Sequence, residues 1–242
     1  MSQIVVFSSL VVSELIFVPL YLKKMWPNKN PTSLLLKMIC ATAYIGMCLA
    51  AVSYNGGFNP CSKLLLAAFI LSWLGDALLH MPLKKDLIWS ILGAVAFLAA
   101  HVFFVCGYGF AGKSFTGNSS FVSVYEIIIA LLLAVILTLV CFKLGSKFKL
   151  LTVGVIIYCV AVSFMCVKAW SLGLQLLRSG TDNAGLASAL LMIGGTCFLL
   201  SDFSLALILF TDRFKVFRAK VFNIATYFTA QACLAATIFI LG

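Results

Sequence analysis

Long apolar runs alternate with short clusters of polar and helix-breaking residues along this 242-residue chain. Each run has about the 20 residues that a helix needs to cross a bilayer. Pro, Gly, Asn and Lys separate one run from the next, for example in the segment Pro27-Asn28-Lys29-Asn30-Pro31. The pattern predicts an all-α polytopic membrane protein, a single integral membrane domain with eight transmembrane helices, over about residues 3–22, 34–53, 63–81, 87–108, 122–142, 150–170, 185–210 and 221–241.

Composition and charge support the same interpretation. Hydrophobic residues make up 63% of the chain and charged residues only 10%, which no soluble domain could bury. The net charge is +10, but the basic residues are spread over short loops, so we expect contact with lipid headgroups and no binding of nucleic acid. The nine cysteines show no metal-binding spacing, and we expect neither a metal nor a cofactor.

The basic residues also predict an orientation. Thirteen of them fall in or beside alternate loops, against four on the other side, which places both termini outside the cytoplasm by the positive-inside rule. The larger group is Lys23, Lys24, Lys29, Lys37, Lys84, Lys85, Lys143, Lys147, Lys149, Arg213, Lys215, Arg218 and Lys220. The smaller group is Lys63, Lys113, Lys168 and Arg178.

Two acidic residues, Asp76 and Asp202, lie inside apolar runs, in the similar short motifs LGDALL and FLLSD. A charge at this position costs roughly 2.5–3.5 kcal/mol on insertion scales, so such residues usually face the protein interior and serve a function. With a rise of about 1.5 Å per residue, both lie roughly 12–15 Å from the cytoplasmic ends of their helices. We expect the two carboxyl groups to meet around one pocket.

Other polar residues fall in the same layer or on polar helix faces. Glu14 and Gln231 have depths of roughly 14–16 Å by the same measure, which predicts a polar chamber in the cytoplasmic half of the membrane. His101 is the one histidine deep in a run, whereas His80 and Glu126 are expected at the interfaces. Asn223, Tyr227 and Gln231 share a helix face that suits either helix packing or substrate binding. Taken alone, Tyr44 and Tyr158 fit hydrogen-bonded core tyrosines.

Six short motifs, in order, resemble those of the YhhN family of lysoplasmalogenases. They are Lys37 before Met38-Ile39-Cys40, LGDALL at Asp76, Gly93-x3-Phe97-x3-His101, Tyr158-x6-Met165, FLLSD at Asp202 and Tyr227-x3-Gln231. The chain departs from the family in having Met38 where proline is common, and Phe104 where tyrosine is frequent.

The resemblance implies hydrolysis of the vinyl-ether bond of a lysoplasmalogen, with a lysophospholipid substrate. Asp76 and Asp202 would be the acid and the carboxylate, as in paired-carboxylate glycoside cleavage. Tyr44, His101, Tyr158, Tyr227, Gln231 and Glu14 would line the chamber, and Lys37 would face the phosphate.

Three alternatives remain beside this hypothesis. A proton-coupled transporter or a lipid-binding membrane protein would also use intramembrane acids and a histidine, although no helix has the paired mid-depth breaks of many transporters. An intramembrane aspartyl protease fits poorly, because Trp73 occupies the first glycine position of its GxGD motif and there is no PAL motif.

The similar sequences around the two aspartates also suggest a weak 4+4 repeat of the helices.

Overall fold

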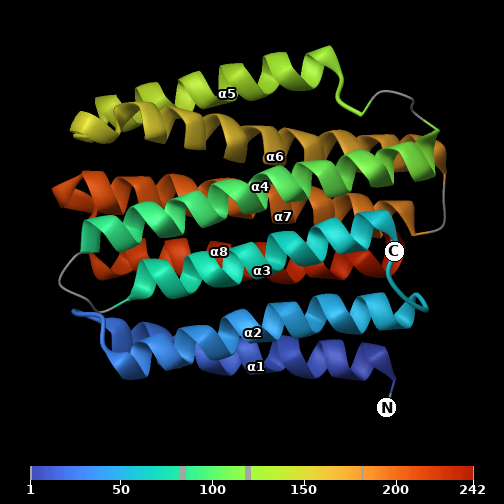
Figure 1. Cartoon of the computed structure of the whole chain (residues 1–242), viewed down its shortest axis with the longest axis horizontal. Coiled ribbons are helices and arrows are strands. Elements are labelled where there is room, and N and C mark those ends of the chain that lie inside the picture. Colours follow the sequence, from blue (N-terminus) through green and yellow to red (C-terminus); the bar gives the residue numbers. More distant parts are fainter. Residues whose placement is uncertain (1, 82–85, 118–120, 181–182, 242) are drawn as a thin grey trace. The chain divides into compact units, whose positions relative to one another are not determined.

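The computed structural model describes residues 2–81, 86–117, 121–180 and 183–241, and within these ranges the chain is helical, without strands. Each of the eight long helices is long and apolar enough to cross a membrane, which confirms the predicted all-α, multi-pass membrane protein (Figure 1). Their bounds are α1 Gln3–Met25, α2 Pro31–Tyr54, α3 Pro60–His80, α4 Asp86–Thr116, α5 Val124–Lys143, α6 Thr152–Ser179, α7 Ala184–Phe210 and α8 Phe217–Leu241. Two short 3₁₀ helices, η1 Lys149–Leu151 and η2 Asp212–Phe214, precede α6 and follow α7.

Local sequence explains where α2 and α3 begin. In α2 the side chain of Asn30 accepts the backbone N–H of Ser33, and the Ser33 side chain accepts the N–H of Asn30. Asn59 and Ser62 repeat this reciprocal cap at α3. A proline occupies the first turn of both helices, where its missing N–H removes no helical hydrogen bond.

Two predicted helix ends are wrong. Helix α4 continues to Thr116, beyond the predicted end at 108, and α6 continues to Ser179, beyond the predicted end at 170. The glycines that suggested an early end of α4 instead allow close packing, because a Cβ atom at Gly107 would lie 2.8 Å from Leu65. Within a bilayer, neighbouring helices support such glycines. Lys84 and Lys85, which contribute to the predicted orientation, lie outside the described residues.

The chain forms two compact units. The first contains residues 1–107 and 231–242, and the second contains residues 108–230. The boundaries therefore fall inside α4 and α8. The single domain, the 4+4 repeat and the orientation in the membrane stay predictions.

In the first unit, hydrogen bonds join both chain ends to the turn between α2 and α3. Gln3 donates to Ser53, and the side chain of Asn55 donates to the Ile238 carbonyl oxygen. Asn59 donates in the same way to the Leu241 carbonyl oxygen. The two termini consequently lie at the same end of this unit (Figure 1).

Small residues let α3 and α4 approach closely in the first unit. A Cβ atom at Gly75 would lie 2.6 Å from the Phe97 ring, and one at Gly93 would lie 2.7 Å from Leu79. Glycine at such contacts is typical of helix packing in membranes. Phe97 is itself buried, so its ring has little room to move. This contact fixes the rotation of α3, and with it the direction of Asp76.

Replacing Gly75 with alanine is expected to destabilise the protein by about 1–3 kcal/mol, the usual effect of overpacking a well-packed core. Thermal unfolding of the purified protein in detergent measures the change. Gly154→Ala in α6 is the matched control, because nothing lies within 4 Å of its Cβ position, and alanine is the better helix former. Equal melting temperatures for the two variants would contradict the packing argument.

In the second unit, α6 packs against both α5 and α7. The Trp170 indole of α6 donates to the Thr196 hydroxyl of α7. Near one end of the unit, the buried side chains of Cys141, Phe148 and Leu207 form an apolar cluster, and Ser146 bonds Thr211 beside it. These contacts fix α7, which carries Asp202.

Candidate functional site

The carboxyl group of Asp76 is the centre of a buried polar cluster in the first unit. Asp76 is only 1% exposed. The Lys37 ammonium lies 2.8 Å from its Oδ1 atom, and the Tyr44 hydroxyl donates to Oδ2 at 3.1 Å. Lys37 Nζ also donates to the backbone oxygen of Asp76 at 3.4 Å. The sequence predicted these residues separately, and the structure brings them together.

Helical spacing explains why α2 can supply both partners. Ser33, Lys37, Cys40 and Tyr44 repeat at intervals of three or four residues, which places them on one face of α2, and all four are buried. The Lys37 ammonium and the Asp76 carboxylate neutralise each other's charge. This pairing, together with the Tyr44 hydroxyl, offsets the desolvation of two buried charges.

Asp202 has a comparable arrangement in the second unit. Its carboxyl group is 7% exposed, and the Tyr158 hydroxyl of α6 donates to Oδ2 at 2.8 Å. In each unit, a tyrosine of the preceding helix therefore donates to the intramembrane aspartate. A hydrogen bond to one carboxyl oxygen helps to fix the orientation of the group.

His80, which the sequence suggests lies at an interface, is the last residue of α3 and is buried. It is 2% exposed, and its Nδ1 and Nε2 atoms lie 3.2 and 2.8 Å from the hydroxyls of Tyr21 and Ser33. His80 stands one helical turn after Asp76 and shares its face of α3. Lys29 Nζ donates to the Leu79 carbonyl oxygen beside this group. The sequence analysis did not identify Tyr21 or Ser33 as part of this group. Ser33 could have been found from its position four residues before Lys37, on the same face of α2.

The remaining predicted residues divide between the units. Glu14, His101 and Gln231 are buried in the first unit. Tyr227 is buried in the second, where its ring makes edge contacts with Phe198 and Phe228. The predicted meeting of Asp76 and Asp202 stays a prediction.

Asn223 supports the packing interpretation of the polar face on α8. Its side-chain amide donates to the carbonyl oxygen and the hydroxyl of Ser201, and Ser201 donates back to the Asn223 carbonyl oxygen. All of these distances lie between 2.8 and 3.1 Å. This reciprocal contact joins α8 to α7 next to Asp202 and contributes to the placement of that residue.

Glu126, which the sequence predicts near an end of its helix, lies in the first turn of α5. Glu126 is fully buried, and Lys168 Nζ lies 3.1 Å from both of its carboxyl oxygens. The same ammonium donates to the Phe121 carbonyl oxygen at 2.7 Å, and Glu126 accepts the backbone N–H of Ser123. The pair joins the first turn of α5 to α6.

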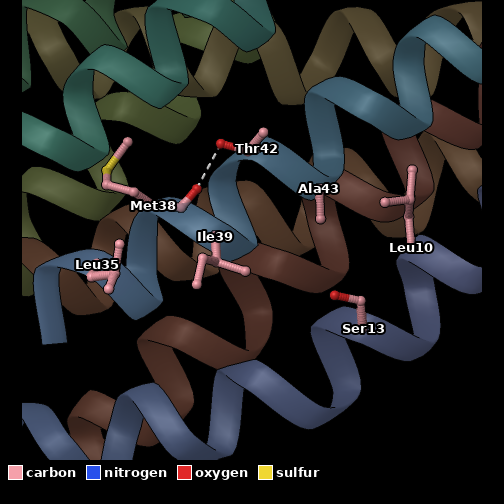
Figure 2. Close-up of a pocket in the computed structure, with 7 residues that line it drawn as sticks. All are labelled: Leu10, Ser13, Leu35, Met38, Ile39, Thr42 and Ala43. Atoms are coloured by element: carbon pink, nitrogen blue, oxygen red, sulfur yellow. Dashed lines mark hydrogen bonds between the residues drawn. The ribbon is translucent and has the colours of Figure 1, made fainter. Parts of the chain in front are cut away.

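An apolar groove of about 380 Å³ opens between α1 and α2 in the first unit. Figure 2 shows its lining residues, which are Leu10 and Ser13 of α1 with Leu35, Met38, Ile39, Thr42 and Ala43 of α2. The Thr42 hydroxyl already donates to the Met38 carbonyl oxygen. The groove face of α2 lies opposite the face that carries Lys37, as their helical positions require. The mainly apolar side chains that line the groove suit contact with hydrocarbon chains.

Comparison with known proteins agrees with the motifs. Residues 32–238 match the YhhN family, a segment that contains Lys37, Asp76, Asp202 and Gln231 but excludes α1. The searches of curated proteins and of solved structures gave no significant match. Since the matched segment covers most of the chain and all but the first of its transmembrane helices, the protein belongs to the YhhN family.

Proposed function

We propose that this protein is a membrane hydrolase that cleaves the vinyl-ether bond of lysoplasmalogens, such as lysoplasmenylethanolamine and its choline analogue. The products are a fatty aldehyde and a glycerophospho-headgroup. The observation that carries the proposal is a buried, tyrosine-bonded aspartate in each of the two motifs that resemble the family's. Membership of the YhhN family is consistent with it.

The chemistry of a vinyl ether explains why carboxyl groups are needed. An acid adds a proton to the alkene carbon that is β to the ether oxygen, and the cation that forms is an oxocarbenium ion. Water attacks the carbon attached to oxygen and gives up a proton to a carboxylate. The resulting hemiacetal breaks its carbon–oxygen bond to release the aldehyde and the alcohol. A general acid and a carboxylate therefore suffice, as in glycoside cleavage.

The contacts of Asp76 favour the role of the carboxylate for this residue. It accepts from the Lys37 ammonium and from the Tyr44 hydroxyl, and these contacts suit a group that acts as a hydrogen-bond acceptor. The role of the acid then belongs to Asp202, whose carboxyl is oriented by Tyr158. This assignment follows the general rule that two carboxyl groups of one reaction differ in environment.

The other residues are proposed to bind the substrate. Glu14, His101, Tyr227 and Gln231 would line the polar part of the site. Lys37 can contact a lipid phosphate while it pairs with Asp76, because an ammonium has three hydrogen-bond donors. The site is proposed to lie in the cytoplasmic half of the membrane, with both chain termini on the opposite side.

The direct test is aldehyde release from lysoplasmenylethanolamine by the purified protein in detergent micelles. We expect turnover of the vinyl ether and none of the saturated-ether analogue, because the analogue has no alkene carbon to protonate. The ester analogue tests for a general lysolipid hydrolase. Unchanged vinyl ether would refute the proposal, and uptake of intact lipid into liposomes would instead support a transporter.

A further inference from the structure

Glu14 is a buried carboxyl group whose charge state the proposed reaction does not explain. It lies in α1 and is only 5% exposed. Its Oε1 atom is buried without a hydrogen-bond partner, and no cation among the described residues forms an ion pair with it. Unpartnered polar atoms are rare in protein interiors, and one in a carboxyl group requires an explanation.

The surroundings of Glu14 already contain one balanced pair of charges. The Asp76 carboxylate acts electrostatically on Glu14, but Asp76 is itself neutralised by Lys37 at 2.8 Å. The other titratable groups of this part of the first unit are the side chains of Tyr21 on α1, Cys40 and Tyr44 on α2, His80 on α3 and His101 on α4, together with the half-buried Lys29, which donates to the Leu79 carbonyl oxygen. Lys37 is the only buried side chain among these with a permanent positive charge.

Charge neutrality then decides the state of Glu14. One ammonium balances one carboxylate, so an ionised Glu14 would leave a net negative charge buried in apolar surroundings. Such a charge is so unfavourable that the group binds a proton or a cation instead. Repulsion from the nearby Asp76 carboxylate acts in the same direction.

We propose that Glu14 is a proton-binding site, neutral while Asp76 is paired with Lys37, whose deprotonation places a second negative charge beside Asp76. Glu14 is then a positioning residue, because it sets the charge around the carboxylate without reacting. The site comes from α1, which lies outside the segment that matches the family. Its effect on catalysis rests on the proposed function, whereas proton binding itself does not.

The test compares the wild type with Glu14→Gln, which keeps the shape of the side chain and stays neutral at every pH. If the folded protein holds a proton that the unfolded chain releases, raising the pH favours unfolding. We therefore expect the melting temperature of the wild type to decrease as the pH rises. In Glu14→Gln the same rise in pH should cause a smaller decrease. Ser13→Ala, on the same helix, is the control and should show the same decrease in melting temperature as the wild type.

Infrared spectroscopy provides a second measurement that does not depend on activity. The carbonyl-stretch band of a protonated carboxylic acid should be present in the wild type at neutral pH and should lose intensity in Glu14→Gln. Identical bands and identical pH dependence of melting in the two proteins would overturn the proposal. Both measurements remain valid if the wild type releases no aldehyde, so a failure of the proposed function is recognised separately.

Activity measurements distinguish a proton from a cationic headgroup as the occupant. With a proton on Glu14, raising the pH from neutral to alkaline should lower the activity of Glu14→Gln by a smaller factor than it lowers that of the wild type. A raised KM at neutral pH for the ethanolamine lipid, but not for a lipid with an uncharged headgroup, would show that an ionised Glu14 binds the headgroup nitrogen. That result would overturn the proton site.

Discussion

Replacing Asp76 with asparagine is expected to lower the rate of aldehyde release by about 10²- to 10⁴-fold, the usual contribution of one acid–base group. Asparagine retains the size of the side chain and can still accept from the Tyr44 hydroxyl. It cannot take a proton from the attacking water or stabilise the oxocarbenium ion by its charge. Initial rates with lysoplasmenylethanolamine measure the effect, and Asp202→Asn should cause a loss of the same order.

The same change leaves the Lys37 ammonium buried without its carboxylate, so a loss of folding must be separated from a loss of chemistry. The double variant Asp76→Asn with Lys37→Met removes the unpaired charge, and it should regain stability without regaining activity. Tyr44→Phe keeps the ion pair and should reduce the rate less than Asp76→Asn does. Wild-type turnover by a folded Asp76→Asn protein would remove this residue from the mechanism.

Replacing Lys168 with methionine is expected to destabilise the protein by about 3–5 kcal/mol, because it leaves a buried carboxylate without its cation. Glu126 has no exposed surface, and both of its oxygens contact the Lys168 ammonium at 3.1 Å. The substitution also removes the hydrogen bond to the Phe121 carbonyl oxygen. Equilibrium denaturation of the purified protein measures the change in unfolding free energy.

Two further variants separate the buried pair from a general effect of charge. Adding Glu126→Gln to Lys168→Met removes the unpaired charge but keeps an acceptor for the Ser123 N–H, so much of the lost stability should return. Lys215→Met breaks the ion pair with Asp212, in which the side chains are 54% and 94% exposed, and it should leave stability unchanged. Similar losses in Lys168→Met and Lys215→Met would show that burial of the pair is unimportant.

Asp212 also provides an example of a group whose pKa depends on a local contact. The Lys215 side chain donates to its carboxylate at 2.7 Å, and this hydrogen bond and charge lower the pKa of Asp212 from its ordinary value. The contact joins residues three apart in the chain and follows directly from η2. It contrasts with the buried pairs, which join residues about forty positions apart.

The candidate site was only partly predictable. Asp76, Asp202 and Lys37 were identified because charges within apolar runs are unusual and because they fall in recognisable motifs. Only the tertiary structure showed their partners. Lys37 and Tyr44 contact Asp76, and Tyr158 contacts Asp202. Burial of Glu126 and His80 was missed because both lie near helix ends, where sequence predicts exposure to the interface.

The sequence by itself determined the eight helices, because each depends on a continuous run of neighbouring residues. The caps at Asn30 and Asn59 are also local, although they begin α2 and α3 three residues before the predicted spans. In lipid, a backbone must satisfy its hydrogen bonds within the segment, so a long apolar run has little choice but to form a helix. Only the tertiary structure decided which polar side chains meet and where α4 and α6 end. Those outcomes depend on the rotation and register of adjacent helices, which close contacts such as Gly75 against Phe97 fix between residues far apart in the chain.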